Sequence, residues 1–173
     1  MTEAAAEAAP DGQVARRTVD GELIEWLTPP ARATLLGLEP HPEGGWYRRT
    51  WAGSHAVTTT AGERPAATLI YFLLPAGEAS AWHVVSSDEI WLWHGPDPVT
   101  LQLGGTAALP SADTDIVLGM DASAGHSAQA LVPAGTWQRT LPSAGETLVS
   151  CLVSPGFSFD DWSLANPVDL NNP

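Results

Sequence analysis

The sequence predicts an all-β protein, a single barrel or sandwich of short strands with one short helix near the N-terminus. Nine runs rich in β-branched and aromatic residues occur within about 110 residues, and glycine or proline bounds most of them. No long helical pattern separates these runs, so alternating parallel strands and helices are not expected. The 16 Gly and 15 Pro, with 44% hydrophobic residues, are typical of a globular fold of many short elements.

The chain divides into a tail and one domain. Residues 1–20 are Ala-rich and polar, without a clean period, and they are predicted to be a flexible N-terminal tail. Residues 21–173 are predicted to form the barrel domain, which is long enough to bury a sizeable core.

One short helix is predicted directly after the tail. Asp20 is a candidate N-cap, and Pro29 and Pro30 end the pattern. The apolar residues at helical spacing are Leu23, Ile24 and Leu27. Residues 31–37 fit either a second helical fragment or an irregular connection.

Nine strands and a closing segment follow the helix. The run EIWLWHG is apolar at every position from Ile90 to Trp93, as expected for a strand covered on both faces, whereas VTLQLGG alternates like a half-exposed strand. Residues 155–167 are rich in turn formers and are predicted to close one end of the barrel. The predicted strands lie within residues 46–53, 66–74, 80–85, 89–95, 99–105, 114–119, 128–132, 136–140 and 147–154.

Charge and cysteine content exclude several classes of partner. With 20 acidic and 7 basic residues, the net charge of −13 disfavours nucleic acid and anionic membranes. Cys151 is the only cysteine, which excludes an internal disulfide and a multi-thiolate zinc site and predicts a cytoplasmic protein. No secretory leader and no membrane-spanning apolar run is recognised.

The segment PAGEASAWHVVSSDEIWLWHG, residues 75–95, carries the most informative residues. Gly77 is followed by His83 and then by Glu89, and the later segment VPAGTWQRT contains a Pro-x-Gly turn followed by Gln138. This pair of segments resembles the two motifs of the cupin superfamily. In the full motifs, Val85 and Gln138 would both be histidines.

The chain also resembles a narrower family of small single-domain cupins of largely unassigned function. The resemblance implies a jelly-roll β-barrel of the sugar-nucleotide epimerase type and a homodimer. The segments that carry it are PHPEGGWYRRTW (40–51), IYFLL (70–74), SAWHVVSSDEIWLWHG (80–95), VPAGTWQ (132–138) and SPGFSFDDW (154–162).

A full cupin motif gathers imidazole and carboxylate ligands around iron, zinc, manganese, nickel or copper. In this chain His83 and Glu89 remain as strong donors, while valine cannot ligate and a glutamine amide is a weak ligand. Tight binding of such a divalent metal would need recruits, such as Glu43, Tyr47 or several waters. No cofactor is therefore required by the sequence, and a metal at His83 and Glu89 stays open.

Without a metal, His83 and Glu89 suit proton transfer, because imidazole titrates near neutral pH and burial raises the pKa of a carboxyl toward it. The structural alternative is a buried pair that only satisfies itself by hydrogen bonding. Burying both groups in a Trp-rich barrel is costly unless they are paired, which favours a site.

Several other side chains are candidates for binding a substrate. Glu43 and Tyr47 follow a Pro-rich, Gly-rich turn and either line the site or lie at the surface. Arg48 and Arg49 are adjacent on a predicted strand, so they face opposite sides, and one of them can anchor a substrate carboxylate. Gln138 is expected to bind a polar substrate atom. An aromatic wall is expected from Trp82, Trp91, Trp93 and Trp137, for which ordinary core packing is the alternative.

Three functions fit these residues. The first is an enzyme that transfers protons on a small organic substrate, as an epimerase, isomerase, cyclase or lyase, with His83 as acid or base and Glu89 as its partner. The second is a metal-dependent dioxygenase or hydrolase with a further ligand that the spacing does not identify. The third is a noncatalytic pocket for a small metabolite. The fold alone does not choose among them.

Overall fold

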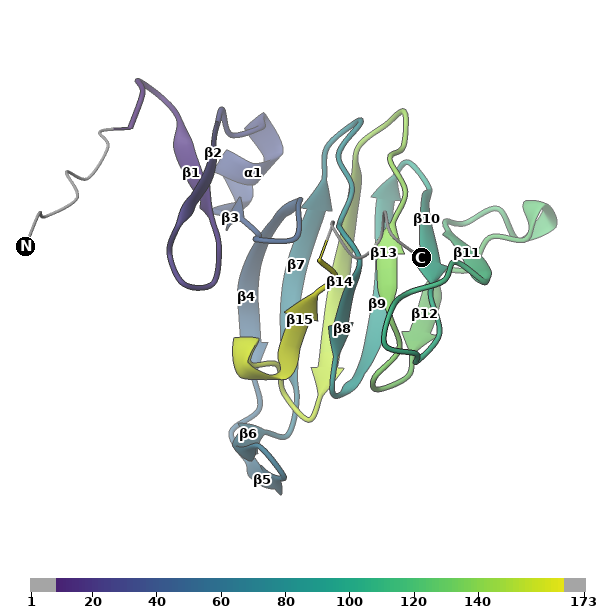
Figure 1. Cartoon of the computed structure of the whole chain (residues 1–173). Coiled ribbons are helices and arrows are strands. Elements are labelled where there is room, and N and C mark those ends of the chain that lie inside the picture. Colours follow the sequence, from purple (N-terminus) through teal and green to yellow (C-terminus); the bar gives the residue numbers. More distant parts are fainter. Residues whose placement is uncertain (1–8, 167–173) are drawn as a thin grey trace, which may run out of the picture.

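The computed structural model describes residues 9–166, in which two antiparallel sheets face each other as a jelly-roll barrel (Figure 1). The six-stranded sheet has the order β12 (Gln129–Val132), β9 (Asp88–Pro96), β14 (Thr147–Ser154), β7 (Thr68–Leu74), β4 (Trp46–Ala52) and β3 (Glu39–Pro40). The five-stranded sheet has the order β11 (Thr114–Leu118), β10 (Val99–Leu103), β13 (Gln138–Thr140), β8 (His83–Val85) and β15 (Trp162–Leu164). The predicted all-β barrel is confirmed.

Two hairpins and three short helices complete the described chain. The hairpins are β1 (Val14–Arg17) with β2 (Leu23–Leu27), and β5 (Ala56–Thr59) with β6 (Gly62–Pro65). The helices are α1 (Ala31–Leu36) and the 3₁₀ turns η1 (Ala122–Ala124) and η2 (Phe159–Asp161). None of the helices in residues 9–166 has the length and apolar character needed to cross a bilayer.

All nine runs predicted to be strands form strands, β4 and β7 to β14. The central strand β14 shows why the pattern succeeds. It pairs along its length with β7 on one side and β9 on the other, which satisfies its backbone groups. Its alternate residues Val149, Cys151 and Val153 are buried between the sheets, as the period of two requires.

The main core fills the space between the two sheets at the end away from β15. It combines large side chains such as Phe72 and Trp91 of the six-stranded sheet with Val99, Leu101 and Leu118 of the facing sheet. Exclusion of these side chains from water is the main source of stability for such a core. The other end of the space between the sheets is left open for a site.

The N-terminal region differs from the prediction. Residues 23–27, expected to be helical, form strand β2, and residues 14–17 of the predicted tail form its partner β1. A helix of this length is marginal in water, whereas pairing with β1 satisfies backbone groups across a turn at Gly21, where φ is 88°. Residues 1–8 of the predicted tail lie outside the described residues.

The short helix lies instead at Ala31–Leu36, the fragment that the sequence left open between helix and irregular connection. Pro30 precedes it with φ −62°, and Gly37 ends it in the left-handed region with φ 63°. Its buried Ala33 packs with Trp46 and Leu73, so α1 covers the outer face of the six-stranded sheet.

Candidate functional site

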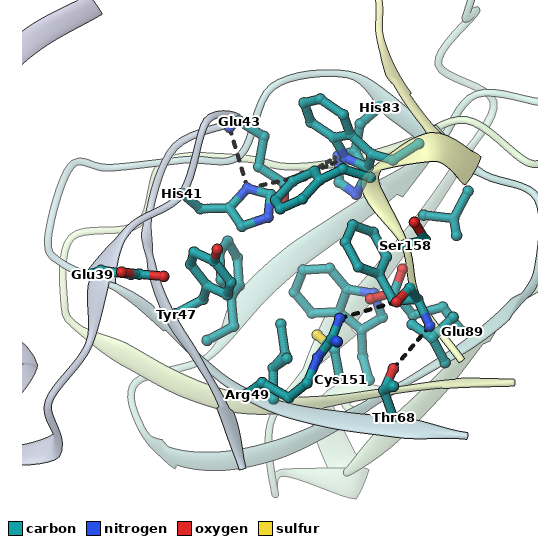
Figure 2. Close-up of a pocket in the computed structure, with 18 residues that line it drawn as sticks. Glu39, His41, Glu43, Tyr47, Arg49, Thr68, His83, Glu89, Cys151 and Ser158 are labelled. Atoms are coloured by element: carbon teal, nitrogen blue, oxygen red, sulfur yellow. Dashed lines mark hydrogen bonds and ion pairs between the residues drawn. The ribbon is translucent and has the colours of Figure 1, made fainter. Parts of the chain in front are cut away.

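A cavity of about 400 Å³ opens between the two sheets (Figure 2). The strands β4, β7, β9 and β14 form one wall, β8 forms the other, and the segment of residues 157–162 covers it. The titratable side chains that line it include Glu39, His41, Glu43, Tyr47, His83 and Glu89. Its aromatic side chains are Tyr47, Phe72, Trp91, Phe157, Phe159 and Trp162.

His83 begins β8 and is almost completely buried, with 2% of its surface exposed. Its Nδ1 lies 2.9 Å from the carbonyl oxygen of Ala81. Because a carbonyl only accepts hydrogen bonds, Nδ1 carries the ring proton and Nε2 carries the lone pair of the neutral ring. Burial lowers the pKa of His83, against the opposing effect of Glu89, so the ring favours the neutral form.

Glu89 comes from β9 and is held from behind by Gln138. The Gln138 Nε2 donates to Glu89 Oε2 at 2.6 Å, while its Oε1 accepts from the Trp91 indole at 2.9 Å. Burial raises the pKa of Glu89, while His83 lowers it, Glu43 raises it, and the Gln138 and Cys151 hydrogen bonds lower it. A carboxyl and an imidazole are thus fixed in one largely apolar cavity.

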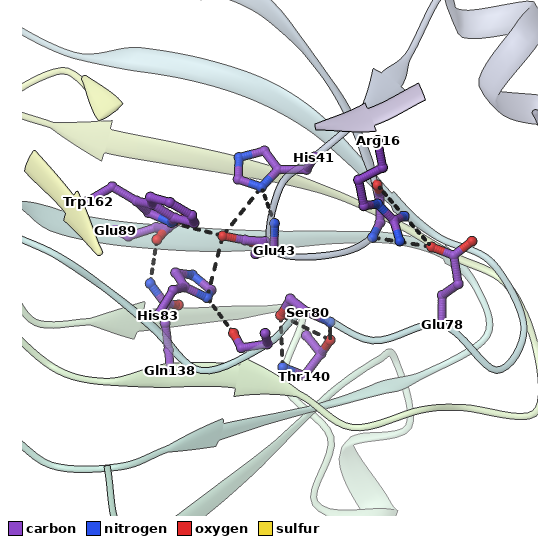
Figure 3. Close-up of polar contacts among 12 residues, drawn as sticks. Arg16, His41, Glu43, Glu78, Ser80, His83, Glu89, Gln138, Thr140 and Trp162 are labelled. Atoms are coloured by element: carbon purple, nitrogen blue, oxygen red, sulfur yellow. Dashed lines mark hydrogen bonds and ion pairs between the residues drawn. The ribbon is translucent and has the colours of Figure 1, made fainter. Parts of the chain in front are cut away.

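His41 and Glu43 lie in the loop between β3 and β4 and form a second pair of titratable groups (Figure 3). Glu43 Oε2 is 3.5 Å from Nδ1 of both His41 and His83, and it accepts a hydrogen bond from the Trp162 indole at 3.0 Å. The backbone N–H of Glu43 donates to His41 Nδ1 at 3.3 Å, which leaves the ring proton of His41 on Nε2. The two histidines therefore hold opposite tautomers around one carboxyl.

Burial decides the charge of this second pair. It raises the pKa of Glu43 to about 8, although the hydrogen bond from Trp162 acts to lower this pKa. It lowers the pKa of His41 to about 3, with smaller contributions from His83 and Arg16. At neutral pH the carboxyl of Glu43 is mostly protonated and both imidazoles are neutral, so the deep end of the cavity carries little charge.

The loop that bears His41 and Glu43 is clamped by the N-terminal hairpin (Figure 3). Arg16 of β1 donates to the Gly45 carbonyl at 3.3 Å and to Glu78 Oε2 at 3.1 Å, and the same Glu78 oxygen accepts from the Gly45 N–H at 3.2 Å. Gly44 has φ 110°, and a Cβ there would lie 2.2 Å from the Ala79 carbonyl oxygen. Only glycine permits this approach.

The covering segment follows β14 and places Phe157, Phe159 and Trp162 over the cavity. Thr68 Oγ1 accepts from the Phe157 N–H at 3.0 Å, and Arg64 binds Asp161 with distances of 2.6 and 3.2 Å. The prediction that this turn-rich segment closes one end of the barrel is confirmed.

The structure corrects part of the predicted aromatic wall and the role of Gln138. Trp91 lines the cavity, but Trp82, Trp93 and Trp137 do not, and Gln138 lies behind Glu89. Neighbouring residues of a strand point to opposite faces, so Trp82 and Trp137 turn away where His83 and Gln138 turn inward. The indoles of Trp93 and Trp137 bond to the carbonyls of Asp97 and Ala107, and Trp82 stacks under Arg139 at 4.7 Å.

The structure places the other predicted site residues at the cavity, together with residues that were not predicted. His83, Glu89, Glu43 and Tyr47 all line the cavity, and of the two neighbouring arginines Arg49 does so. His41, Phe72, Phe157, Phe159 and Trp162 line the cavity but were not predicted from the sequence. The Gly44–Gly45 pair was the available signal for a close, buried turn at His41.

A jelly-roll barrel with a histidine and a glutamate facing its interior defines the class of cupins. The chain belongs to the family described as Cupin superfamily (DUF985), whose model matches residues 32–165. No curated protein matches the chain.

Solved structures support this assignment. The chain is similar to a hypothetical protein from Leishmania major, with 32% identity over 80% of this chain and 87% of that chain and a TM-score of 0.71. It is also similar to a protein from Shewanella oneidensis, with 36% identity over 80% and 85% and a TM-score of 0.72. A cupin-2 domain from Rhodospirillum rubrum, at 11% identity over 96% and 84% and TM-score 0.52, shares the fold.

Cupins often bind metals, but the donor set of this cavity does not fit a firmly held ion. Within residues 9–166 no three His, Cys, Asp or Glu side chains are grouped so as to hold a metal. Val85 lines the cavity without a donor atom, and both ends of the Gln138 amide are used by Glu89 and Trp91. His41 Nδ1 and Glu43 Oε2 already accept hydrogen bonds from the Glu43 N–H and the Trp162 indole. His83 and Glu89 would therefore leave iron, zinc, manganese, nickel or copper dependent on water for most of its ligands.

Proposed function

We propose that this protein is an enzyme that transfers protons on a small organic substrate, in an epimerisation, isomerisation, cyclisation or elimination. The observation that carries the proposal is the buried imidazole of His83, with Nδ1 held by the Ala81 carbonyl, in one aromatic cavity with the carboxyl of Glu89. A neutral imidazole is a proton acceptor, and a carboxyl whose pKa is raised by burial holds its proton more readily than an exposed one.

Each polar residue then has a distinct role. His83 Nε2 accepts the proton of an activated C–H group, and Glu89 returns a proton to the substrate from a second position. Glu43 Oε2 lies 3.5 Å from Nδ1, where loss of the Glu43 proton stabilises the ring as the ring gains charge. Gln138 keeps Glu89 in place and is a positioning residue.

The proposal is tested by hydrogen exchange into substrates. The protein is incubated in D₂O with a metabolite extract, and mass spectrometry identifies compounds that gain deuterium at carbon faster than in buffer. We expect at least one such compound, and we expect His83→Gln to abolish its exchange. His55→Gln, which changes an exposed histidine outside the cavity, is the matched control and keeps full exchange. Equal exchange with wild type and His83→Gln would contradict the assignment of the base.

A noncatalytic pocket for a small metabolite is the second candidate. The largely apolar, aromatic lining favours it, because such walls suffice to bind a planar molecule. This candidate predicts that a compound from the extract is retained by the protein and that no compound exchanges. Retention without exchange would therefore replace the enzyme proposal by the binding proposal.

We also propose that the chain is a cytoplasmic homodimer that binds neither nucleic acid nor membranes. The family resemblance supports the dimer, and the net charge of −13 supports the absence of polyanionic partners. Light scattering during gel filtration tests the dimer, and a monomeric mass at micromolar concentration would contradict it.

A further inference from the structure

We propose that Arg49 is an anion anchor, and that the substrate is a compact carboxylic acid with an aromatic or otherwise unsaturated body. This inference rests on the proposed function, because it assigns the substrate class of the same cavity. It is carried by the placement of one guanidinium that faces the cavity, has no acidic partner within residues 9–166 and lies beside aromatic walls.

The position of Arg49 follows from the alternation of strand β4. Tyr47 and Arg49 share the face that lines the cavity, whereas Arg48 between them does not line it (Figure 2). Arg48 lies toward the outer side, where its Cδ is 3.9 Å from the position that a Cβ on Gly37 would take. The two neighbouring arginines therefore lie on opposite sides of the sheet.

Arg49 is not neutralised within the protein. Three other arginines, Arg16, Arg32 and Arg64, each have a carboxylate within 4 Å, but no such carboxylate lies near Arg49 among the described residues. Among the described residues, Arg49 uses one Nη2 N–H to donate a hydrogen bond to the Phe157 carbonyl at 3.0 Å. A guanidinium has five N–H donors, so most of its capacity is available to a ligand. Three more arginines, Arg17, Arg48 and Arg139, likewise form no ion pair among the described residues, but Arg49 is the arginine that lines the cavity.

The groups that face Arg49 leave room for an anion. Tyr47 lies between Arg49 and Glu39, and burial together with Glu39 raises its pKa to about 12, so its hydroxyl stays protonated (Figure 2). Deeper in the cavity His41 and His83 are neutral, and burial raises the pKa of both Glu43 and Glu89. Glu39 is the acidic side chain at the rim, and it lies on the other side of Tyr47 from Arg49.

The walls define the rest of the ligand. Phe157 and Phe159 lie against each other with ring centroids 5.1 Å apart, and Phe72 and Trp91 form a second edge-to-face pair at 5.8 Å. A cavity of about 400 Å³ with such walls suits a compact planar molecule. One guanidinium matches the single charge of a carboxylate, whereas a phosphate monoester carries nearly two charges and usually needs more donors. We therefore assign a carboxylate.

The test compares three simple probes with the full-length protein: phenylacetate, phenylacetamide and phenyl phosphate. Binding is followed by quenching of tryptophan fluorescence, because Trp91 and Trp162 line the cavity. We expect phenylacetate to bind at least about tenfold more tightly than its uncharged amide, the gain typical of a charge-assisted hydrogen bond. Arg49→Gln should remove this preference, and Arg48→Gln, its neighbour on the outer side, should retain it.

Several results would overturn the inference. Equal binding of phenylacetate and phenylacetamide by the wild-type protein would do so without any variant, which guards against a folding defect in Arg49→Gln. The inference would also be overturned if Arg49→Gln still preferred phenylacetate to phenylacetamide. Tighter binding of phenyl phosphate than of phenylacetate, or no binding of any probe at millimolar concentrations, would overturn it as well. Because none of these measurements involves deuterium exchange, failure here leaves the proton-transfer proposal standing, and failure of exchange leaves the anion site standing.

Discussion

Replacing Glu43 by glutamine should change how stability depends on pH. In the folded protein burial raises the pKa of Glu43 from 4.5 to about 8, whereas in the unfolded chain it ionises at its ordinary value. Between these two values the folded state binds the additional proton, so the free energy of unfolding falls as the pH rises. Glutamine cannot ionise, and its side-chain oxygen can still accept the hydrogen bond from Trp162, so Glu43→Gln should lose this dependence while keeping the contact.

The size of the effect follows from the two pKa values. One pKa step corresponds to about 1.4 kcal/mol, so the full rise of Glu43 corresponds to a loss of about 5 kcal/mol on passing from acid to alkaline pH. About 2 kcal/mol of this loss falls between about pH 6.5 and pH 8, a window that starts at the ordinary pKa of histidine. Above pH 8 the loss levels off, because Glu43 then ionises in both states.

The assay is urea unfolding followed by tryptophan fluorescence at both pH values. Subtracting the result for Glu43→Gln from that for wild type isolates Glu43 from the other buried groups, including Glu89. Glu63→Gln, an exposed glutamate on the β5–β6 hairpin, is the matched control and should behave as wild type. If wild type and Glu43→Gln lost the same stability between the two pH values, the claim that Glu43 is buried and protonated in the folded protein would be refuted.

Two further substitutions test how the loop of the site is held, both by urea unfolding. Arg16→Met removes the buried donor to the Gly45 carbonyl and should cost about 1–3 kcal/mol, whereas Arg17→Met, on the exposed side of β1, should cost little; equal costs would contradict the clamp. Gly45→Ala should cost at least about 1 kcal/mol more than Gly12→Ala, because both have φ 70° but only the first places a Cβ 2.8 Å from the Phe72 ring. Similar losses at the two glycines would contradict the tight packing under the loop.

The barrel was predictable because its strands are encoded locally. Runs such as that of β14 alternate buried and partly exposed residues and end at turn formers, so nine strands could be found without knowing their partners. The N-terminal hairpin was not predictable from the sequence, because its two strands are short and β2 alone fits a helical spacing equally well. The β structure of β2 depends on pairing with residues 14–17. No local pattern in those Ala- and Arg-containing residues predicts a strand.

The site was predictable where residue type and strand period agree. His83 and Glu89 followed from the motif, but His41 depends on a loop folded back against residues 79–81, a long-range contact. For Trp93 the period of two favours the same face as Trp91, yet its indole bonds to the Asp97 carbonyl beyond the cavity. Distance along the strand, not only the face, decides which side chains reach a site.

The central claim is that His83 is a neutral base with its proton on Nδ1. Nuclear magnetic resonance of protein labelled with ¹⁵N in histidine measures the protonation of each ring nitrogen directly, and His83→Gln assigns the His83 signals. We expect His83 to be neutral at pH 6.5, the ordinary histidine pKa, with Nδ1 protonated and Nε2 unprotonated, because burial lowers its pKa. A ring that becomes charged near pH 6.5, or that carries its proton on Nε2, would contradict the account.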